Sequence, residues 1–279
     1  MTRVSTRKTE VSGVITLLTD FGMADPYVGI MKGVMLGINP DARLVDISHG
    51  IQPGNIFEAG VVLKESYAYF PRGTVHVAVV DPGVGTSRRA LVLLADGHFF
   101  VAPDNGLLWP IISKQPTNTL IHLTNPAFFL HPISNTFHGR DIFAPVAAHL
   151  ALGASPFEMG NPIDDPIKLS IPLPMEHGQK LKGQVIRVDR FGNLITNIDV
   201  RTLTQYAASP LSNVTVTVGP MKIKGISSTY ADVPTGKELA LIGSSGFLEI
   251  SVNQGRADRK IDPCGMVVGT SVWVDKTGA

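Results

Sequence analysis

The N-terminal half of the chain alternates short β-branched runs with stretches that place apolar residues at helical spacing. The clearest strands and helices are expected, in chain order, at 14–19, 27–36, 43–47, 56–69, 74–80 and 142–152. This alternation is typical of parallel strands joined by crossover helices. The pattern therefore predicts a doubly wound, Rossmann-like α/β domain over 13–165, after a polar and disordered tail over 1–12.

The C-terminal part of the chain has a different pattern, in which short apolar runs are broken by Gly, Asn, Ser or Pro. These runs lie at 180–188, 214–218, 221–226, 238–242, 247–252 and 267–274. Such spacing predicts a small antiparallel barrel or sandwich over 180–279. The stretch 154–179 is rich in proline, glycine and acidic residues, so it is expected to lack regular structure, with the linker proper at 166–179.

The composition of the chain argues against some classes of function but does not identify the function. Hydrophobic residues make up 44% and charged residues 17% of the 279 residues, as in an ordinary globular protein. The net charge of +1 offers no footprint for nucleic acid or an anionic membrane. No window approaches the roughly 20 apolar residues of a membrane span, and the polar first residues have no signal core. A cytoplasmic protein without membrane or nucleic-acid partners is predicted.

Metal and disulfide chemistry are not expected from this sequence. Cys264 is the single cysteine, so it has no partner for an intrachain disulfide or a zinc motif. The histidines are scattered, without the spacing of paired zinc ligands. We therefore predict neither a metal nor a cofactor.

The segment from Asp81 to Arg89 is the leading candidate for chemistry. It follows the strand 74–80 and carries a carboxylate, a glycine-rich turn and two guanidinium groups. Open α/β sheets bind ligands beyond the carboxyl ends of their strands. The glycines also suit a phosphate loop, but 90–95 is predicted to be a strand, whereas a phosphate loop needs a helix. Only one of the two arginines, Arg88 or Arg89, needs to point into the expected active site.

Other candidates each have a structural alternative. Asp20 and Asp46 lie near the ends of the first two strands, so with Asp81 they are expected at one edge of the sheet. Asp20 or Asp81 taken singly is more typical of a turn, whereas the two together favour a functional site. His138 precedes the helix at 142–152, where it is either part of a helix entry or a titratable ring at the sheet edge.

Two turns in the C-terminal half offer recognition groups. Asp189 to Asn197 presents a carboxylate, the aromatic ring of Phe191 and two carboxamides. An asparagine side chain donates and accepts, which suits the edge of adenine, although Gly-Asn is also ordinary turn chemistry. The turn at 243–246 has hydroxyls and N–H groups that suit a small carboxylate.

Five separated motifs, in order along the chain, resemble the signature of the S-adenosylmethionine (SAM) hydroxide adenosyltransferases, also called adenosine-forming SAM hydrolases. The motifs are 19–22 (TDFG), 81–86 with Arg88 (DPGVGT), 137–141 (FHGRD), 189–193 (DRFGN) and 244–250 (SSGFLEI). The resemblance spans residues 14–274. It implies an α/β domain followed by a β-barrel, and a homotrimer whose active sites lie between neighbouring subunits.

The resemblance also implies roles for individual residues. Asp81, Arg88 and His138 are expected to surround the attacking water. The residues expected to bind substrate are Asp20 (ribose hydroxyls), Phe21, Asp189 (methionine ammonium), Phe191 and Phe247 (nucleoside), Asn193 (adenine), and Ser244 or Ser245 (methionine carboxylate). The implied reaction is attack of water at the 5′ carbon of SAM, giving adenosine and methionine.

Three other functions stay open from the sequence. Halogenating relatives carry an aromatic residue where this chain has Asp81, and a carboxylate would repel a halide. Fluorinating members also have an extra loop where this chain has only residues 96–98 between two predicted strands. A non-catalytic SAM or adenosine binder would need the same adenosine contacts. A metal-dependent phosphohydrolase built on Asp20, Asp46 and Asp81 would need divalent ions.

Overall fold

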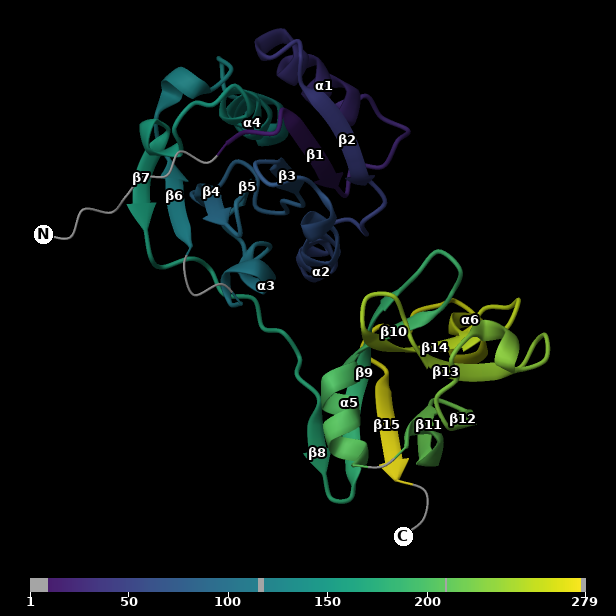
Figure 1. Cartoon of the computed structure of the whole chain (residues 1–279). Helices are drawn as coiled ribbons and strands as arrows, with labels where there is room; N and C mark the ends of the chain where they lie inside the picture. Colours follow the sequence, from purple (N-terminus) through teal and green to yellow (C-terminus); the bar gives the residue numbers. More distant parts are fainter. Residues whose placement is uncertain (1–9, 115–117, 209, 277–279) are drawn as a thin grey trace, which may run out of the picture. The chain divides into compact units, whose positions relative to one another are not determined.

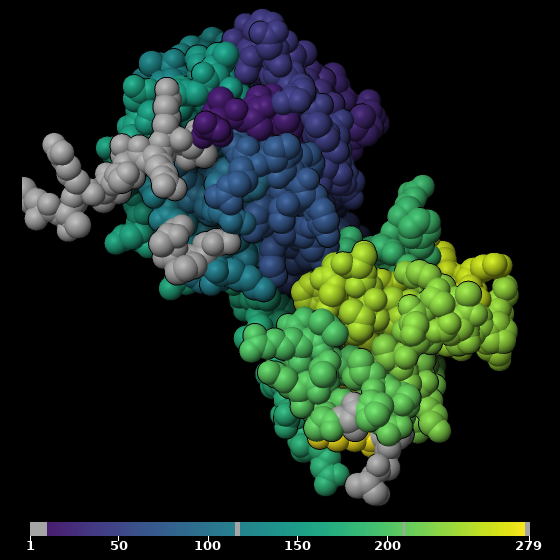
Figure 2. Space-filling model, viewed as in Figure 1, coloured from purple at the N-terminus to yellow at the C-terminus, as the bar shows by residue number. Residues whose placement is uncertain are grey.

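The structure, a computed structural model, describes residues 10–114, 118–208 and 210–276. The chain divides into two compact units, Met1–Ile171 (unit 1) and Pro172–Ala279 (unit 2) (Figure 1). Figure 2 shows the outer surface of the two units in a space-filling view. In the described ranges no helix combines the length and apolar character that a membrane crossing requires.

Unit 1 is built on a mixed seven-stranded sheet with the order β2-β1-β3-β5-β4-β6-β7. Its strands are β1 (Val14–Thr19), β2 (Arg43–Ser48), β3 (Val75–Val79), β4 (Ala90–Ala95), β5 (His98–Pro103), β6 (Thr119–Leu123) and β7 (Gly160–Ile163). Strands β2, β1, β3 and β5 are parallel, whereas β4, β6 and β7 pair antiparallel. The predicted α/β architecture is confirmed, but the sheet is parallel only in its first part.

Helices cover both faces of this sheet because its central strands are apolar on both faces. The helices are α1 (Tyr27–Ile38), α2 (Ile56–Ser66), α3 (Trp109–Ile112) and α4 (Ala144–Ala151). Met31 and Met35 of α1 pack with α4 in one buried cluster, while Leu63 of α2 and Ile111 of α3 belong to the cluster of the opposite face. Strands β1 and β3 are fully buried neighbours, so the loops that follow them emerge at the same sheet edge.

The connection between β4 and β5 is one residue shorter than the predicted 96–98, because His98 already begins β5. Asp96 and Gly97 form its turn with φ values of +50° and +74°. Positive φ at both central residues is the geometry of the tight turn that suits twisted strands. Because a strand and not a helix follows the 81–89 loop, the phosphate-loop interpretation is excluded.

Unit 2 is an eight-stranded sheet whose strands pair antiparallel and whose order is β12-β11-β15-β9-β10-β14-β13, with β8 beside β9. The strands are β8 (Met175–His177), β9 (Lys180–Val188), β10 (Leu194–Asp199), β11 (Val214–Val218), β12 (Met221–Lys224), β13 (Glu238–Ile242), β14 (Phe247–Val252) and β15 (Ser271–Lys276). Two helices, α5 (Val200–Ala207) and α6 (Asp258–Ile261), complete it. The barrel-like prediction is confirmed, although β10 and α5 were not foreseen.

The stretch 154–179 has more structure than its prolines indicate. Strand β7 pairs with β6, and β8 pairs with β9, so the expectation of irregular structure is wrong at both ends. Pro162 is accommodated because β7 lies at the sheet edge, where a strand can spare a donor. Most of the predicted tail, 1–9, lies outside the described residues, whereas Ser12 contacts Thr74 at 3.1 Å.

A buried histidine pair lies within unit 1. The Nδ1 atom of His76 is 2.8 Å from the hydroxyl of Thr16, and its Nε2 atom is 3.3 Å from Nδ1 of His98. The His76 ring stacks on Phe100 with the centroids 5.0 Å apart. Burial, followed by the nearby His98, lowers the pKa of His76 to about 3, and burial also lowers the pKa of His98.

We expect this pair to make the stability of unit 1 sensitive to acid. The unfolded chain takes up a proton at His76 near pH 6.5, whereas the folded chain resists protonation until about pH 3. The stabilisation is therefore complete above pH 6.5 and is lost as the pH falls, by at most about 1.4 kcal/mol per pH unit and histidine.

Denaturant unfolding between pH 7 and pH 4 measures this dependence. A Trp273→Phe background leaves Trp109 as the sole tryptophan, so its fluorescence reports unit 1. In that background His76→Asn should flatten the pH dependence, while substitution of the exposed His177 should not. An equally steep dependence in His76→Asn would contradict the assignment.

Candidate active site

Asp81, Arg88 and His138 meet in unit 1, as the sequence predicts. The Nε atom of Arg88 lies 2.9 Å from each oxygen of Asp81, and Nη2 of Arg88 also contacts Asp81. The same Nη2 atom is 2.8 Å from Nδ1 of His138. Both side chains of the ion pair are nearly buried, with exposed fractions of 5% for Asp81 and 8% for Arg88. One guanidinium therefore joins the carboxylate to the imidazole.

The local fold explains how residues distant in sequence come together. Asp81 follows β3, and the chain turns back through Thr86, whose hydroxyl donates to the Gly83 carbonyl at 2.7 Å, to reach Arg88 before β4. The Arg88 guanidinium lies over the Phe143 ring, 5.3 Å from its centroid. His138 precedes the helical turn Gly139–Phe143 and Phe143 is its last residue, so the ring supports the arginine next to its histidine partner.

The protonation state of His138 follows from its partner. An arginine only donates hydrogen bonds, so Nδ1 of His138 accepts and the ring proton resides on Nε2. Burial, followed by the positive charge of Arg88, lowers the pKa of His138 against the opposing effect of Asp81 and Asp141. The imidazole is therefore neutral near pH 7, with Nε2–H as its free donor.

Asp20 and Phe21 follow β1, beside the strand that leads to Asp81. The Oδ2 atom of Asp20 accepts a hydrogen bond from the Gly54 backbone at 2.8 Å. Phe21 packs edge to face with Tyr27 and with Phe137, at centroid distances of 5.8 and 6.1 Å. Since Phe137 precedes His138, the aromatic cluster connects the 19–22 turn to the Asp81–Arg88–His138 cluster.

Asp46 and Arg89 have structural partners instead. Asp46 lies 2.7 Å from the Lys32 ammonium and 3.0 Å from Nε2 of His49, so it serves an ion pair and does not join a carboxylate cluster. Arg89 pairs with Asp104 and Asp165, both at 2.7 Å. Within the described residues no three His, Cys, Asp or Glu side chains gather closely enough to hold a metal ion.

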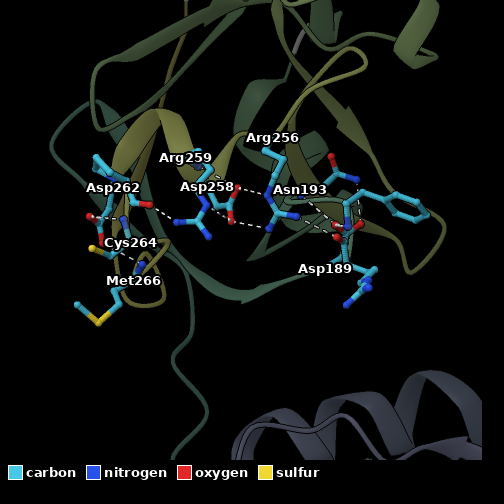
Figure 3. A network of polar contacts seen from close by, with 11 residues as sticks. Asp189, Asn193, Arg256, Asp258, Arg259, Asp262, Cys264 and Met266 are labelled. Carbon is cyan, nitrogen blue, oxygen red and sulfur yellow. Dashed lines mark hydrogen bonds and ion pairs between the residues drawn. The ribbon is translucent and has the colours of Figure 1, made fainter.

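The predicted recognition turn of unit 2 is held by its own carboxylate. Oδ1 of Asp189 accepts from the backbone of Phe191 at 2.8 Å and of Asn193 at 2.9 Å, and Oδ2 accepts from the Asn193 carboxamide at 2.8 Å (Figure 3). Three of the acceptor positions of Asp189 are thus already used. The Phe191 ring is 74% exposed, so it is available for stacking.

A pocket of about 480 Å³ adjoins this turn in unit 2. Its lining comprises Phe191, Asn193, Tyr230, Val252, Gln254, Gly255 and Arg256. The Arg256 guanidinium is fixed by Asp258, with Nε–Oδ1 and Nη2–Oδ2 distances of 3.1 and 2.7 Å (Figure 3). A planar base between an aromatic ring, a carboxamide and a guanidinium fits such a lining.

Tyr230 and Arg256 were missed by the sequence reasoning. Both lie in segments between strands, without a motif around them. One feature of the sequence does point to Arg256. It directly follows the turn at 252–255, and charged residues in such loops commonly serve binding.

The remaining predicted residues lie on the β13–β14 hairpin. Gly243 donates to the Phe247 carbonyl at 2.9 Å and closes the turn, which leaves Ser244 and Ser245 exposed at its tip. The predicted site residues therefore form two groups. Asp20, Phe21 and the Asp81–Arg88–His138 cluster belong to unit 1, and the others belong to unit 2.

Fold and site together define a two-domain protein, with an α/β unit that holds a partly buried Asp–Arg–His cluster and a β-barrel-like unit that holds a pocket. Residues 15–160 match the SAM hydroxide adenosyltransferase N-terminal domain, and residues 183–263 match the C-terminal domain of the same family. The chain belongs to the SAM hydroxide adenosyltransferase family, so the resemblance predicted from its motifs is confirmed.

Individual relatives agree with this membership. The (R)-S-adenosyl-L-methionine hydrolase of Thermus thermophilus is 37% identical, over 87% of this chain and 93% of the relative. A fluorinase of Nocardia brasiliensis is 27% identical, over 94% of this chain and 96% of the relative. The crystal structure of an uncharacterized conserved protein from Thermotoga maritima aligns with a TM-score of 0.87 at 37% identity, over 94% of this chain and 100% of that one.

The geometry of the cluster predicts how His138 titrates. Removal of the Arg88 charge in Arg88→Gln should raise the pKa of His138, because a positive neighbour is lost and Asp81 is left uncompensated. Nuclear magnetic resonance titration of the imidazole protons measures the shift. Arg89→Gln is the matched control, since the partners of Arg89 are Asp104 and Asp165. An unchanged or lower pKa in Arg88→Gln would contradict the assigned contact.

Proposed function

We propose that this protein hydrolyses SAM to adenosine and L-methionine by attack of water at the 5′ carbon. The observation that carries the proposal is the buried contact of Asp81 and His138 with one arginine, in a chain of this family. The relative from Thermus thermophilus, which bears the name of this activity, supports it over most of the chain.

The difficult part of this reaction is activation of the nucleophile, water. The sulfonium of SAM leaves as the neutral thioether of methionine, so departure needs no acid and no metal. Water, with a pKa of about 15.7, has to lose a proton as it attacks. We infer that one water contacts both Asp81 and His138, and its orientation along the carbon–sulfur axis lowers the barrier further.

The roles within the cluster follow from the hydrogen bonds. His138 uses Nδ1 to accept from Arg88, so its Nε2–H is left to donate to the oxygen of the water. Asp81 keeps one acceptor position beyond its three hydrogen bonds from Arg88, and we infer that it takes the proton there. Arg88 remains charged, fixes both partners and stabilises the developing hydroxide.

Substrate recognition is assigned to both units. Asp20 takes the ribose hydroxyls, with Phe21 beside it. The pocket that contains Phe191 and Asn193 takes adenine, and Phe247 packs on the nucleoside. Ser244 or Ser245 takes the methionine carboxylate, and Asp189 faces the ammonium. We propose that the full site forms in a homotrimer, where unit 1 of one subunit meets unit 2 of its neighbour, and that the protein is cytoplasmic and uses no cofactor.

Hydroxide is favoured over halide as the nucleophile. A buried carboxylate at Asp81 repels an anion but can accept a proton from water. The turn between β4 and β5 has only two residues, so this chain lacks the extra loop expected of the fluorinating members. Charged groups around the water position distinguish the site from that of a passive SAM binder.

The first test is the reaction itself. Incubation with SAM in ¹⁸O-labelled water should give methionine and adenosine that carries solvent oxygen at the 5′ position, with or without chloride. Mass spectrometry of the products measures this outcome. Chloroadenosine would instead indicate a halogenase, and tight binding of SAM without turnover would indicate a binding protein.

The second test separates turnover from binding. Asp81→Asn and His138→Ala should each lower kcat by about 100-fold or more while the dissociation constant of SAM stays within a few-fold, because their contacts act mainly in the transition state. Initial rates and equilibrium binding measure the two quantities. The exposed residues Asp41 and His177 provide matched controls as Asp41→Asn and His177→Ala. Equal losses in binding and turnover would refute the assigned roles.

A further inference from the structure

Glu249 is a buried carboxylate within the 244–250 motif, and the proposed mechanism gives it no role. It lies on β14, where the alternate residues Leu248, Ile250 and Val252 point into the barrel core. Side chains alternate along a strand, so Glu249 and Ser251 face the opposite side of the sheet. Glu249 is nevertheless only 6% exposed.

The carboxylate of Glu249 is hydrogen-bonded but not neutralised. Its Oε1 atom accepts from the Tyr230 hydroxyl at 2.7 Å and from the Ser251 hydroxyl at 2.8 Å. Over the described part of the chain, Glu249 forms no ion pair with a lysine, arginine or histidine. A buried charge without a counter-ion is costly, so a cation supplied by a ligand would stabilise this group.

The position of Glu249 connects the two recognition features of unit 2. On one side, Tyr230 reaches from the Oε1 atom to the lining of the pocket. On the other, Oε2 is directed at Gly243, where an added Cβ would lie only 2.6 Å from it. Gly243 opens the turn that presents Ser244 and Ser245. The carboxylate thus lies between the pocket for the base and the turn for the amino acid.

The other carboxylate of this region, Asp189, is largely occupied by hydrogen bonds within its own turn. Asp189 uses three acceptor positions within its own turn. Burial, the hydrogen bond to Glu249 and the negative charges of Glu249 and Asp189 raise the pKa of Tyr230 to about 12, so its hydroxyl stays protonated and keeps donating to Glu249. Glu249 is therefore fixed in place through Oε1, while its Oε2 atom has no hydrogen-bond donor among the described residues.

We propose that Glu249 is a specificity residue that recognises the positive charge on the methionine half of the substrate. This inference rests on the proposed function. SAM carries two cations in this half, the sulfonium and the α-ammonium, and an α-ammonium group lies next to the carboxylate that the 243–246 turn would receive. A fixed anion between base and amino acid selects a cationic ligand over a neutral nucleoside.

The test compares ligands that differ in charge. Kinetics of wild type and Glu249→Gln give kcat/KM for SAM and inhibition constants for S-adenosylhomocysteine, which keeps only the ammonium, and for adenosine, which has neither cation. Glu249→Gln keeps an acceptor for Tyr230 and Ser251 but removes the charge. We expect kcat/KM for SAM to fall at least tenfold, with the inhibition constant of adenosine unchanged within twofold.

The inhibition constant of S-adenosylhomocysteine identifies the cation. A parallel loss for this inhibitor assigns Glu249 to the ammonium as a second carboxylate beside Asp189, and a loss confined to SAM assigns it to the sulfonium. Tyr230→Phe, which removes the hydrogen bond but keeps the charge, should preserve the preference for SAM over adenosine. The exposed Glu176 of β8 provides the matched control as Glu176→Gln.

Two results would overturn the inference. Equal weakening of all three ligands in Glu249→Gln, or no weakening at all, would leave Glu249 a purely structural residue, with thermal unfolding as the check on folding. Failure of the proposed function is a separate result, since it would show as a wild-type protein that neither binds nor cleaves SAM.

Discussion

The contact of one guanidinium with both a carboxylate and an imidazole is the interaction on which the site depends. Arg88 holds Asp81 through two nitrogens and reaches His138 with one of them. Because arginine donates and does not accept, it determines the tautomer of His138 as well as its position. The burial of the Asp81–Arg88 ion pair shields this contact from bulk solvent.

The architecture of unit 1 makes this contact possible. The parallel strands β1 and β3 end side by side, which delivers Asp20 and Asp81 to one edge of the sheet. The change to antiparallel pairing at β4 returns the chain to that edge with Arg88. Unit 2 contributes a pocket of about 480 Å³, which is lined by amide, aromatic and cationic groups.

Much of this arrangement was readable in the sequence. The strands 14–19 and 238–242 were predicted at the bounds observed, and a short connection between two strands was predicted at 96–98, where the turn occupies 96–97. Strand β7 was missed because Pro162 argues against a strand, and only its place at the sheet edge makes the residue tolerable. Tyr230 and Arg256 were missed because segments between strands carry no periodicity.

The sequence by itself determined the two-domain organisation, the family and the residue types of the Asp–Arg–His cluster, since these depend on local pattern and motif order. Only the tertiary structure decided which of two adjacent arginines enters the site. Arg88 meets Asp81 and His138, whereas Arg89 meets Asp104 and Asp165. Neighbouring side chains on an extended segment point in opposite directions, so what each contacts depends on elements that are remote along the chain.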